Sequence, residues 1–287
     1  MRKGGAYMEE SFTINIPEQH CHSSLSSGSK GSMALMTSAA IIKGCDGITF
    51  TENYDCYSGT KSRRKSVDLD EYRHRIASMR DIYDGIVKIG FGIELGMRSD
   101  PEIARKIKQD LCLYDFDLII GSVSIVNGVD ITRDKSFFKG KSKRIAYGEY
   151  FDEVLRCIDL YRGAFDVMGH LDYITQYGDY EDGKIGSFFG ERIDKILKKL
   201  VEYNKGLEIN TSGLTKGFDS TSPSVKIVKR FRELGGTCIT FGSDAKCSKN
   251  IADHFGDAIK IAKEAGFEDV AYFQKRRPTF IKFQELQ

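Results

Sequence analysis

The chain reads VKIGFGIE at Val87–Glu94, an apolar run of β-forming residues that ends on a carboxylate. A carboxylate at the end of a buried strand costs desolvation energy unless it is paired or bound to a metal. Six similar runs recur along the chain, and several of them also end on a polar or charged residue. The predicted strands are Phe12–Pro17, Gly47–Thr51, Val87–Glu94, Leu118–Val123, Phe165–Gly169, Gly206–Ile209 and Cys238–Gly242.

Longer amphipathic segments follow these strands and predict helices. Ser32 and Asp100-Pro101 are typical of helix N-termini, and glycines near the expected helix ends are typical of C-termini. Seven β-then-α units in sequence favour a parallel sheet covered by helices. The predicted helices are Ser32–Lys43, Leu69–Tyr83, Asp100–Gln109, Tyr147–Tyr161, Ser187–Tyr203, Ser222–Leu234 and Ile251–Ala265.

Two folds fit this alternation, a doubly wound open sheet and a closed barrel. Reactive residue types lie at or just beyond the C-terminal end of nearly every predicted strand: His20, Glu52, Glu94, Ser124, His170, Glu208 and Asp244. A barrel brings all its strand ends to one rim, where its active site is built, whereas an open sheet would scatter about half of them. The pattern therefore favours a barrel, with His170 in the same rim as the other strand-end residues.

The composition is that of an ordinary globular protein. Of its 287 residues 40% are hydrophobic and 29% charged, and 43 basic residues nearly balance 41 acidic ones, for a net charge of +2. A net charge this small gives no strong positive electrostatic potential, so it does not indicate nucleic acid or an anionic membrane as a partner. The length fits one α/β barrel, so it does not require a second domain.

Cysteine usage and the N-terminal sequence bear on the compartment. The cysteine count is odd, at seven, and no CxxC pair occurs, so a disulfide framework is not expected. The N-terminus lacks an apolar core of signal-peptide length, and no stretch is apolar enough to span a membrane. We therefore expect a cytoplasmic protein, and the sequence leaves the oligomeric state open.

His20 and His22 form a His-x-His pair, whose rings share one face of an extended strand. Alone, such a pair is more often part of a polar loop. Together with Glu94, His170 and Asp244, however, it supplies three imidazoles and two carboxylates. That mixture suits Zn, Mn or Fe better than Ca or Mg, so the set predicts a transition-metal site.

Seven short motifs occur in order along the chain: His20-Cys21-His22-Ser23, Phe50-Thr51-Glu52, Gly92-Ile93-Glu94, Gly121-Ser122-Val123, Gly169-His170-Leu171-Asp172, Glu208-Ile209-Asn210-Thr211-Ser212-Gly213-Leu214 and Phe241-Gly242-Ser243-Asp244-Ala245. They resemble the successive motifs of the polymerase-and-histidinol-phosphatase (PHP) superfamily, in its histidinol-phosphatase branch. The resemblance runs from about Ile16 to Pro278. It implies a distorted (β/α)7 TIM-like barrel over residues 1–287 as one domain, with residues 1–11 as a flexible tail.

The resemblance also implies a function, namely hydrolysis of a phosphate monoester with Zn, Mn or Fe ions. In this branch the substrate is L-histidinol phosphate, an intermediate of histidine biosynthesis. We therefore expect a small phosphorylated or polar metabolite as the ligand. Two alternatives stay open: a degenerate paralogue with a binding or regulatory role, and a single-metal hydrolase or lyase acting on another substrate.

The chain departs from the family pattern at several positions. Where the family has an aspartate and three ligand histidines, this sequence has Gly28, Asn53, Ser124 and Lys246. Basic residues of the family are replaced by Thr175-Gln176 and by Thr215. The Lys246 ammonium is placed where it can partly replace a lost cation.

One four-ligand metal site survives these replacements. We expect one divalent transition metal, held by His20, His22, Glu94 and Asp244. The expected catalytic residues are Glu52, His170 and Lys246, and the expected substrate-binding residues are Asn210 and Ser212. Residues near the lost positions that offer themselves as substitute ligands are Asp55, Cys56 and Cys247.

Overall fold

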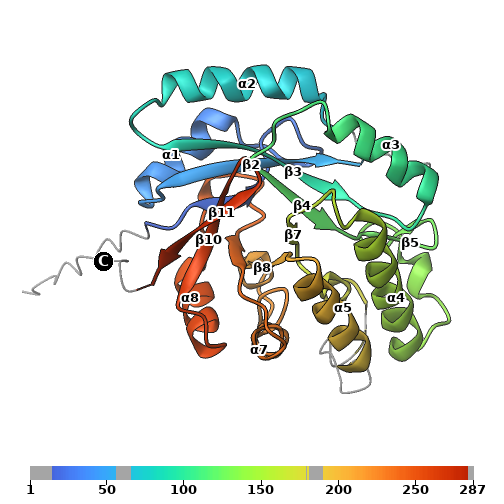
Figure 1. The fold of residues 1–287 in the computed structure, drawn as a ribbon. Helices are drawn as coiled ribbons and strands as arrows, with labels where there is room; N and C mark the ends of the chain where they lie inside the picture. Colours follow the sequence, from blue (N-terminus) through green and yellow to red (C-terminus); the bar gives the residue numbers. More distant parts are fainter. Residues whose placement is uncertain (1–14, 56–65, 179, 181–189, 284–287) are drawn as a thin grey trace, which may run out of the picture.

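A computed structural model describes residues 15–55, 66–178, 180 and 190–283 of the chain (Figure 1). Seven parallel strands form one sheet in the order β1-β2-β3-β4-β7-β8-β9. A parallel bridge between Cys21 and Ala245 brings β1 beside the chain that follows β9, so the sheet is a nearly closed barrel. The strands are β1 Glu18–Cys21, β2 Gly47–Tyr54, β3 Lys88–Gly96, β4 Leu118–Ser122, β7 Val167–Met168, β8 Gly206–Asn210 and β9 Ile239–Gly242.

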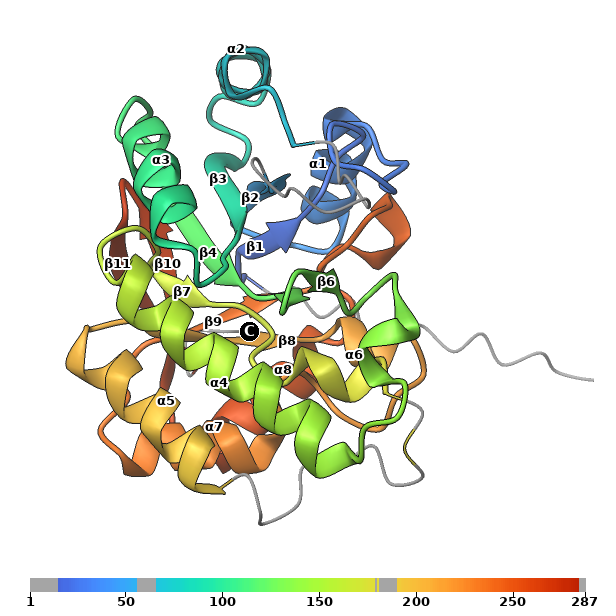
Figure 2. The same cartoon turned by 90° about the vertical axis from the view of Figure 1, so that its right-hand side faces the viewer.

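Helices surround this barrel, as Figure 2 shows, and the predicted barrel architecture is confirmed. Ser32, Asp68 and Asp100 cap the helices that follow them, since each side chain accepts a hydrogen bond from a backbone N–H of the first turn. The α-helices are α1 Met33–Ile42, α2 Leu69–Ile82, α3 Pro101–Leu111, α4 Lys143–Tyr161, α5 Gly190–Glu202, α6 Ser212–Thr215, α7 Val225–Glu233 and α8 Phe255–Glu264. Within the described ranges, none is both long and apolar enough to cross a membrane.

Several predicted boundaries are wrong, among them the start of α4, which begins at Lys143 and not at Tyr147. Two of the differences have a clear physical cause. The first strand does not end at Pro17 but occupies Glu18–Cys21. It begins after Pro17, because proline has no backbone N–H to donate to a neighbouring strand. The last helix does not begin at Ile251 but at Phe255, because Ala252 and His254 adopt left-handed backbone angles that a helix excludes. Residues 12–14 of the predicted first strand, the expected tail 1–11 and residues 187–189 lie outside the described residues.

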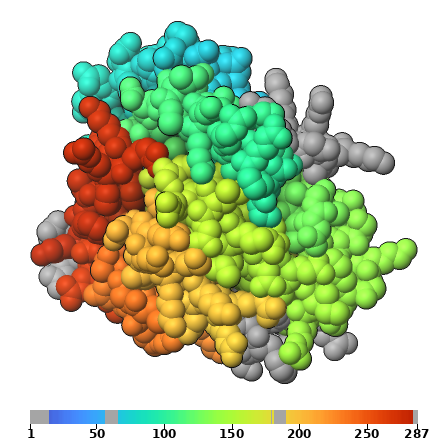
Figure 3. Space-filling model, turned by 45° about the vertical axis from the view of Figure 1, so that its right-hand side comes forward, coloured from blue at the N-terminus to red at the C-terminus, as the bar shows by residue number. Residues whose placement is uncertain are grey.

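A C-terminal hairpin that the sequence pattern did not predict covers one end of the barrel. It consists of β10 (Asp269–Gln274) and β11 (Arg277–Lys282). Ala271 and Phe273 pack against a cluster of buried strand residues, and in Figure 3 the red hairpin lies beside yellow and green segments of the barrel. The N-terminal end of the barrel is thereby closed.

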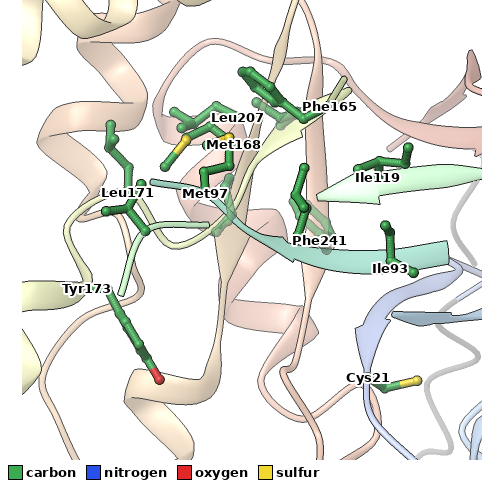
Figure 4. Packing of buried hydrophobic residues seen from close by; sticks show 14 of the residues in the cluster. Cys21, Ile93, Met97, Ile119, Phe165, Met168, Leu171, Tyr173, Leu207 and Phe241 are labelled. Atoms are coloured by element: carbon green, nitrogen blue, oxygen red, sulfur yellow. The ribbon is translucent and has the colours of Figure 1, made fainter. Parts of the chain in front are cut away.

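Apolar side chains on the outer face of the strands pack against the surrounding helices. Met97, Phe165, Met168, Leu207 and Phe241 are all buried and belong to one cluster with helix residues, part of which Figure 4 shows. The loops at the opposite, C-terminal end carry a second short hairpin, β5 (Ile125–Val126) with β6 (Val129–Asp130), and three 3-10 turns. These turns are η1 (Lys135–Phe138), η2 (Tyr173–Gln176) and η4 (Ser248–Asn250).

Candidate metal centre

His20 and His22 lie at the C-terminal end of β1, the first inside the strand and the second just beyond it. Both side chains are fully buried, with ring centroids 5.2 Å apart. Neither Nε2 atom makes a hydrogen bond to any described residue. A buried polar atom left without a partner costs about 1–3 kcal/mol, so this pair fits a metal ion better than a packed core.

Glu94 in β3 and Asp244 after β9 bring two carboxylates to these imidazoles. Glu94 Oε2 lies 3.5 Å from His22 Nε2 and 3.7 Å from His20 Nε2. Asp244 Oδ1 lies 3.0 Å from His22 Nε2 and 3.9 Å from His20 Nε2. Asp244 has a φ of 49°, and such left-handed angles in residues other than glycine cluster at functional sites.

The distances between the imidazoles and the carboxylates resemble those between ligands of one ion. Tetrahedral coordination with bonds of about 2.0–2.2 Å places neighbouring ligand atoms roughly 3.3–3.6 Å apart. The four imidazole-to-carboxylate distances run from 3.0 to 3.9 Å and bracket that range. Among the described residues, no group of ligand atoms within 4.8 Å of one another contains both Glu94 and Asp244, so these two carboxylates must move closer together before all four side chains can hold one ion.

His170 reaches the same cluster from the end of β7. Its Nε2 lies 2.9 Å from Glu94 Oε1, and its ring centroid lies 5.8 Å from that of His20. The expectation that His170 shares the rim is therefore confirmed. Two overlapping groups have ligand atoms within 4.8 Å of one another, His20 with Glu94 and His170, and His20 with His22 and Asp244.

The electrostatics of the cluster favour bound positive charge. Burial acts to raise the pKa of Glu94, but the hydrogen bond with His170 and the nearby His20 imidazole outweigh burial and hold that pKa well below its usual range. Burial is likewise outweighed at Asp244, where Lys246 and His22 keep the pKa low. Both carboxylates are therefore ionised, and protons or a metal ion must balance them.

Glu94, His170 and Asp244 line a cavity of about 230 Å³. Two cations face it, Lys246, whose Nζ lies 3.5 Å from Asp244 Oδ1, and Arg133. Its remaining lining residues are Ser27, Gly28, Asn53, Ser124, Thr132, Tyr173 and Tyr177. A small polar cavity with two cations beside a ligand cluster suits an anionic substrate.

Comparisons with known proteins agree with this geometry. The model of the PHP domain matches residues 18–212. The chain belongs to the PHP domain family. A probable histidinol-phosphatase of Clostridium acetobutylicum is 31% identical over 90% of this chain and 97% of its own length. The histidinol-phosphatase of Lactococcus lactis subsp. lactis is 30% identical over 89% of this chain and 93% of its own.

Solved structures show the same likeness. A histidinol phosphate phosphatase from Lactococcus lactis, in complex with Zn, L-histidinol and phosphate, is 29% identical and superimposes with a TM-score of 0.82 over 92% of this chain and 99% of that chain. A putative histidinol phosphatase from Listeria monocytogenes, 18% identical with a TM-score of 0.70, covers 84% of this chain and 99% of its own. The second likeness supports the PHP fold alone.

Four of the seven positions at which the resemblance implies a departure from the family pattern gather at one place. Gly28, Asn53, Ser124 and Lys246 all line the cavity, together with Glu94. Asn53 Nδ2 lies 3.4 Å from His22 Nδ1, in reach of a ring that the metal cluster uses. These four positions therefore belong to the wall of the candidate site, whereas Thr175, Gln176 and Thr215 do not line the cavity.

Glu52, expected to be catalytic, is fully buried and does not line the cavity. It accepts hydrogen bonds from the Ser23 backbone N–H and from the Ser26 hydroxyl. The Ser26 hydroxyl in turn lies 3.5 Å from His22 Nδ1. This geometry places Glu52 behind His22, where it orients a candidate ligand through Ser26.

Asn210 and Ser212, expected to bind substrate, are also buried and absent from the cavity wall. Asn210 donates to Glu208 and accepts from the Ser212 backbone N–H, so both ends of its amide are engaged. The Ser212 hydroxyl lies 3.5 Å from Lys216 Nζ. Their direct contact with substrate stays a prediction.

The three residues considered as substitute ligands add none to the cluster. Asp55 is buried and Cys247 is half-buried, and neither belongs to a ligand group among the described residues. Cys56 lies outside the described residues. By contrast, the sequence reasoning missed Arg133, although it stands in the loop after a strand whose end was predicted to face the rim.

Proposed function

We propose that this PHP chain is a metal-dependent phosphomonoesterase of the histidinol-phosphatase type. The observation that carries the proposal is the spacing of His20, His22, Glu94 and Asp244. Two imidazoles and two carboxylates at 3.0–3.9 Å are a ligand set for Zn, Mn or Fe. We propose one tightly held ion, because this is the ligand set that survives the replacements.

His20, His22, Glu94 and Asp244 would hold a divalent ion, which when bound would supply Lewis-acid polarisation of a phosphoryl oxygen. His170 donates to Glu94 Oε1 and so keeps Oε2 turned toward the imidazoles. Lys246 and Arg133 line the cavity and donate to the oxygens of a bound phosphate. Both cations favour the additional negative charge that develops on those oxygens in the transition state.

The proposed substrate is histidinol phosphate. Support comes from the relatives, since the Lactococcus lactis protein binds L-histidinol and phosphate and is similar over 92% of this chain. Tyr173 packs against the His170 ring with centroids 4.2 Å apart, and Tyr177 packs against Tyr173 at 4.9 Å. These two tyrosines give the cavity an aromatic wall for the organic part of a substrate.

A second candidate is a single-metal phosphatase that acts on a different phosphate monoester. The observation that favours it is that Asn53, Ser124 and Lys246, the residues that the resemblance implies in place of three family histidines, all line the cavity. Asparagine and serine are poor primary ligands for a transition metal. Losing one cationic contact to a transferring phosphoryl group costs on the order of 3–4 kcal/mol, or about 10²–10³ in rate.

One experiment tests both candidates. Purified protein is analysed for bound metals and then assayed with Zn or Mn against histidinol phosphate and a panel of other phosphate monoesters. We expect about one equivalent of metal, and histidinol phosphate turnover roughly three orders of magnitude or more below the ordinary enzyme range of about 1–10³ per second. His22→Ala should lose the metal, whereas His74→Ala, on the exposed face of α2, should keep it.

The outcomes separate the candidates. Turnover of histidinol phosphate within the ordinary range would show that the replaced ligands matter less than the geometry implies. Faster turnover of another monoester would favour the second candidate. Wild-type protein that binds no transition metal would overturn the proposed function.

A further inference from the structure

Glu208 is a fully buried carboxylate in β8 that does not line the cavity. Its Oε1 lies 2.5 Å from His20 Nδ1. Its Oε2 accepts the backbone N–H of His170 at 2.9 Å and the side-chain amide of Asn210 at 3.1 Å. One carboxylate therefore contacts a candidate metal ligand and the neighbouring strand-end histidine together.

The contact with His20 fixes which ring nitrogen is free. A carboxylate accepts hydrogen bonds and cannot donate one when ionised, so Nδ1 of His20 carries the proton. That leaves Nε2, which faces Glu94 and Asp244, as the nitrogen with a lone pair for a metal. Metal-bound histidines commonly donate their other N–H to a carboxylate, which orients the ring and raises its basicity.

The contact with His170 holds a strained backbone. His170 has a φ of 25°, a region that residues other than glycine seldom adopt. The hydrogen bond from its N–H to Glu208 Oε2 stabilises this conformation. The same conformation carries the His170 ring to Glu94.

Two glycines on the neighbouring strands make room for the carboxylate. A Cβ at Gly242 would overlap both Glu208 Oε1 and His20 Cβ. A Cβ at Gly169 would lie 2.6 Å from Ile120 and 3.3 Å from Glu208 Oε2. The space around Glu208 is therefore shaped by β7 and β9 to fit this side chain.

We propose that Glu208 is a positioning residue of the metal centre, which holds His20 and His170 in the geometry that binds the ion. The proposal rests on the proposed function, because it assigns His20 Nε2 to a metal. Glu208 has no contact with the cavity, so it acts through the two histidines. Its negative charge also makes His20 a stronger ligand than a neutral partner would.

Glu208→Gln tests this role, because glutamine has nearly the same shape without the charge. A glutamine oxygen in the place of Oε2 still accepts the bonds from His170 and Asn210, but the NH₂ then faces His20 Nδ1 and cannot accept its proton. We expect the dissociation constant for Zn to rise by about 10–100-fold, measured by competition with a chelator. In Zn-loaded protein, the NMR chemical shift of the His20 Nδ1–H proton should also change from that of a strongly hydrogen-bonded proton to that of a weakly bonded one.

Glu18→Gln is the matched control. Glu18 is equally buried and accepts the backbone N–H of His20 at 2.9 Å, with further hydrogen bonds from Ser243 and Ala252. It contacts no imidazole among the described residues. We therefore expect this variant to unfold more readily while its Zn affinity changes by less than about threefold, since its hydrogen bonds reach only backbone groups and a hydroxyl.

Three results are informative. If Glu208→Gln unfolds more readily but binds Zn as the wild type does, Glu208 is only structural and the proposal is overturned. If both variants weaken Zn binding equally, the effect is general loosening, and the proposal is also overturned. If the wild type binds no Zn, the proposed function falls together with this role, whereas Zn binding without phosphatase activity leaves the positioning test intact.

Discussion

Asp172, two residues after His170, shows how burial tunes a single carboxyl group. It is 3% exposed and accepts hydrogen bonds from the Ser222 hydroxyl and, at 3.1 Å, from the Ser224 backbone N–H. Burial raises the pKa of Asp172 to about 6, and these hydrogen bonds offset only part of that rise. The folded chain therefore binds a proton on Asp172 at pH values where the unfolded chain has released it.

This shift predicts how stability depends on pH. Because the pKa of Asp172 is higher in the folded state, its contribution is fully present below about pH 4 and is lost as pH rises to about 6. The loss of stability amounts to roughly 3 kcal/mol, because the pKa differs by about two between the folded and unfolded states and each pKa unit corresponds to about 1.36 kcal/mol. Asp172→Asn, which can still bond Ser222 and Ser224, should remove this dependence.

Urea unfolding at pH 4, 5, 6 and 7 checks the prediction. The variant should gain stability relative to wild type across this range, by roughly 3 kcal/mol in total. Other groups titrate in both proteins, so only the difference between the two curves is diagnostic. A difference that stays constant from pH 4 to pH 7 would contradict the shifted pKa of Asp172.

At the scale of single residues, the ligand positions were predictable because their residue types are costly where they stand. Glu94 and Asp244 end strands that are otherwise apolar, and His20 and His22 form a His-x-His pair, so these candidate ligands are visible in the sequence. The partner of His20 was not predictable. Glu208 lies 188 residues further along the chain, and only the closed barrel brings the two together.

At the scale of elements, the β10–β11 hairpin is held to the barrel by a buried amide. Gln19 in β1 is 1% exposed, donates to the Ala271 carbonyl at 2.7 Å and accepts the Phe273 N–H at 3.0 Å. These two bonds join segments more than 250 residues apart. They also satisfy backbone groups of β10 on the side that faces away from β11.

Gln19→Ala should therefore destabilise the fold by about 2–4 kcal/mol, since it leaves one buried N–H and one buried C=O without partners. Gln109→Ala is the control, because Gln109 is an exposed residue of α3 whose amide bonds only Arg105. Its loss should stay within about 0.5 kcal/mol. Equal unfolding midpoints of the two variants in urea would show that the hairpin does not depend on Gln19.

The hairpin was not predictable from the pattern that revealed the barrel. The strands of the barrel are recognisable because each is buried and is followed by a helix, whereas β11 is largely exposed and follows β10 directly. The first strand was predicted too early in the sequence, because its own residues Glu18 and Gln19 are polar and do not look like a buried strand. Both are nevertheless buried, and each makes hydrogen bonds to backbone groups.

At the scale of the whole molecule, the barrel concentrates substitutions that are scattered in sequence. Asn53 lies in β2, Ser124 follows β4 and Lys246 follows β9, yet all three line one cavity of about 230 Å³. The surrounding frame of His20, His22, Glu94 and Asp244 keeps ligand spacing. The proposed ligands therefore stand beside a wall in which the resemblance implies three replaced histidines.

Asn53→His, Ser124→His and Lys246→His together test whether this wall alone limits metal binding. The triple variant returns three imidazoles to a cavity that still has His170 and Glu94 beside it. We expect bound metal to rise from about one equivalent to about two or more, because imidazole is a good transition-metal ligand and asparagine, serine and ammonium are not. Metal analysis after gel filtration measures the stoichiometry.

Each single replacement should change little, because ligands that act as a unit are strongly non-additive. The three single variants are therefore the controls for the triple variant. Phosphatase activity should rise only if the enlarged ligand set leaves room for a phosphate, since Lys246→His removes one of the two cations that face the cavity. If the triple variant binds no more metal than the wild type, then the residues that hydrogen-bond to the ligands, and not the ligands alone, limit metal binding. Because such outer groups orient the rings, further histidines would then be of no use without partners like Glu208 and Glu52.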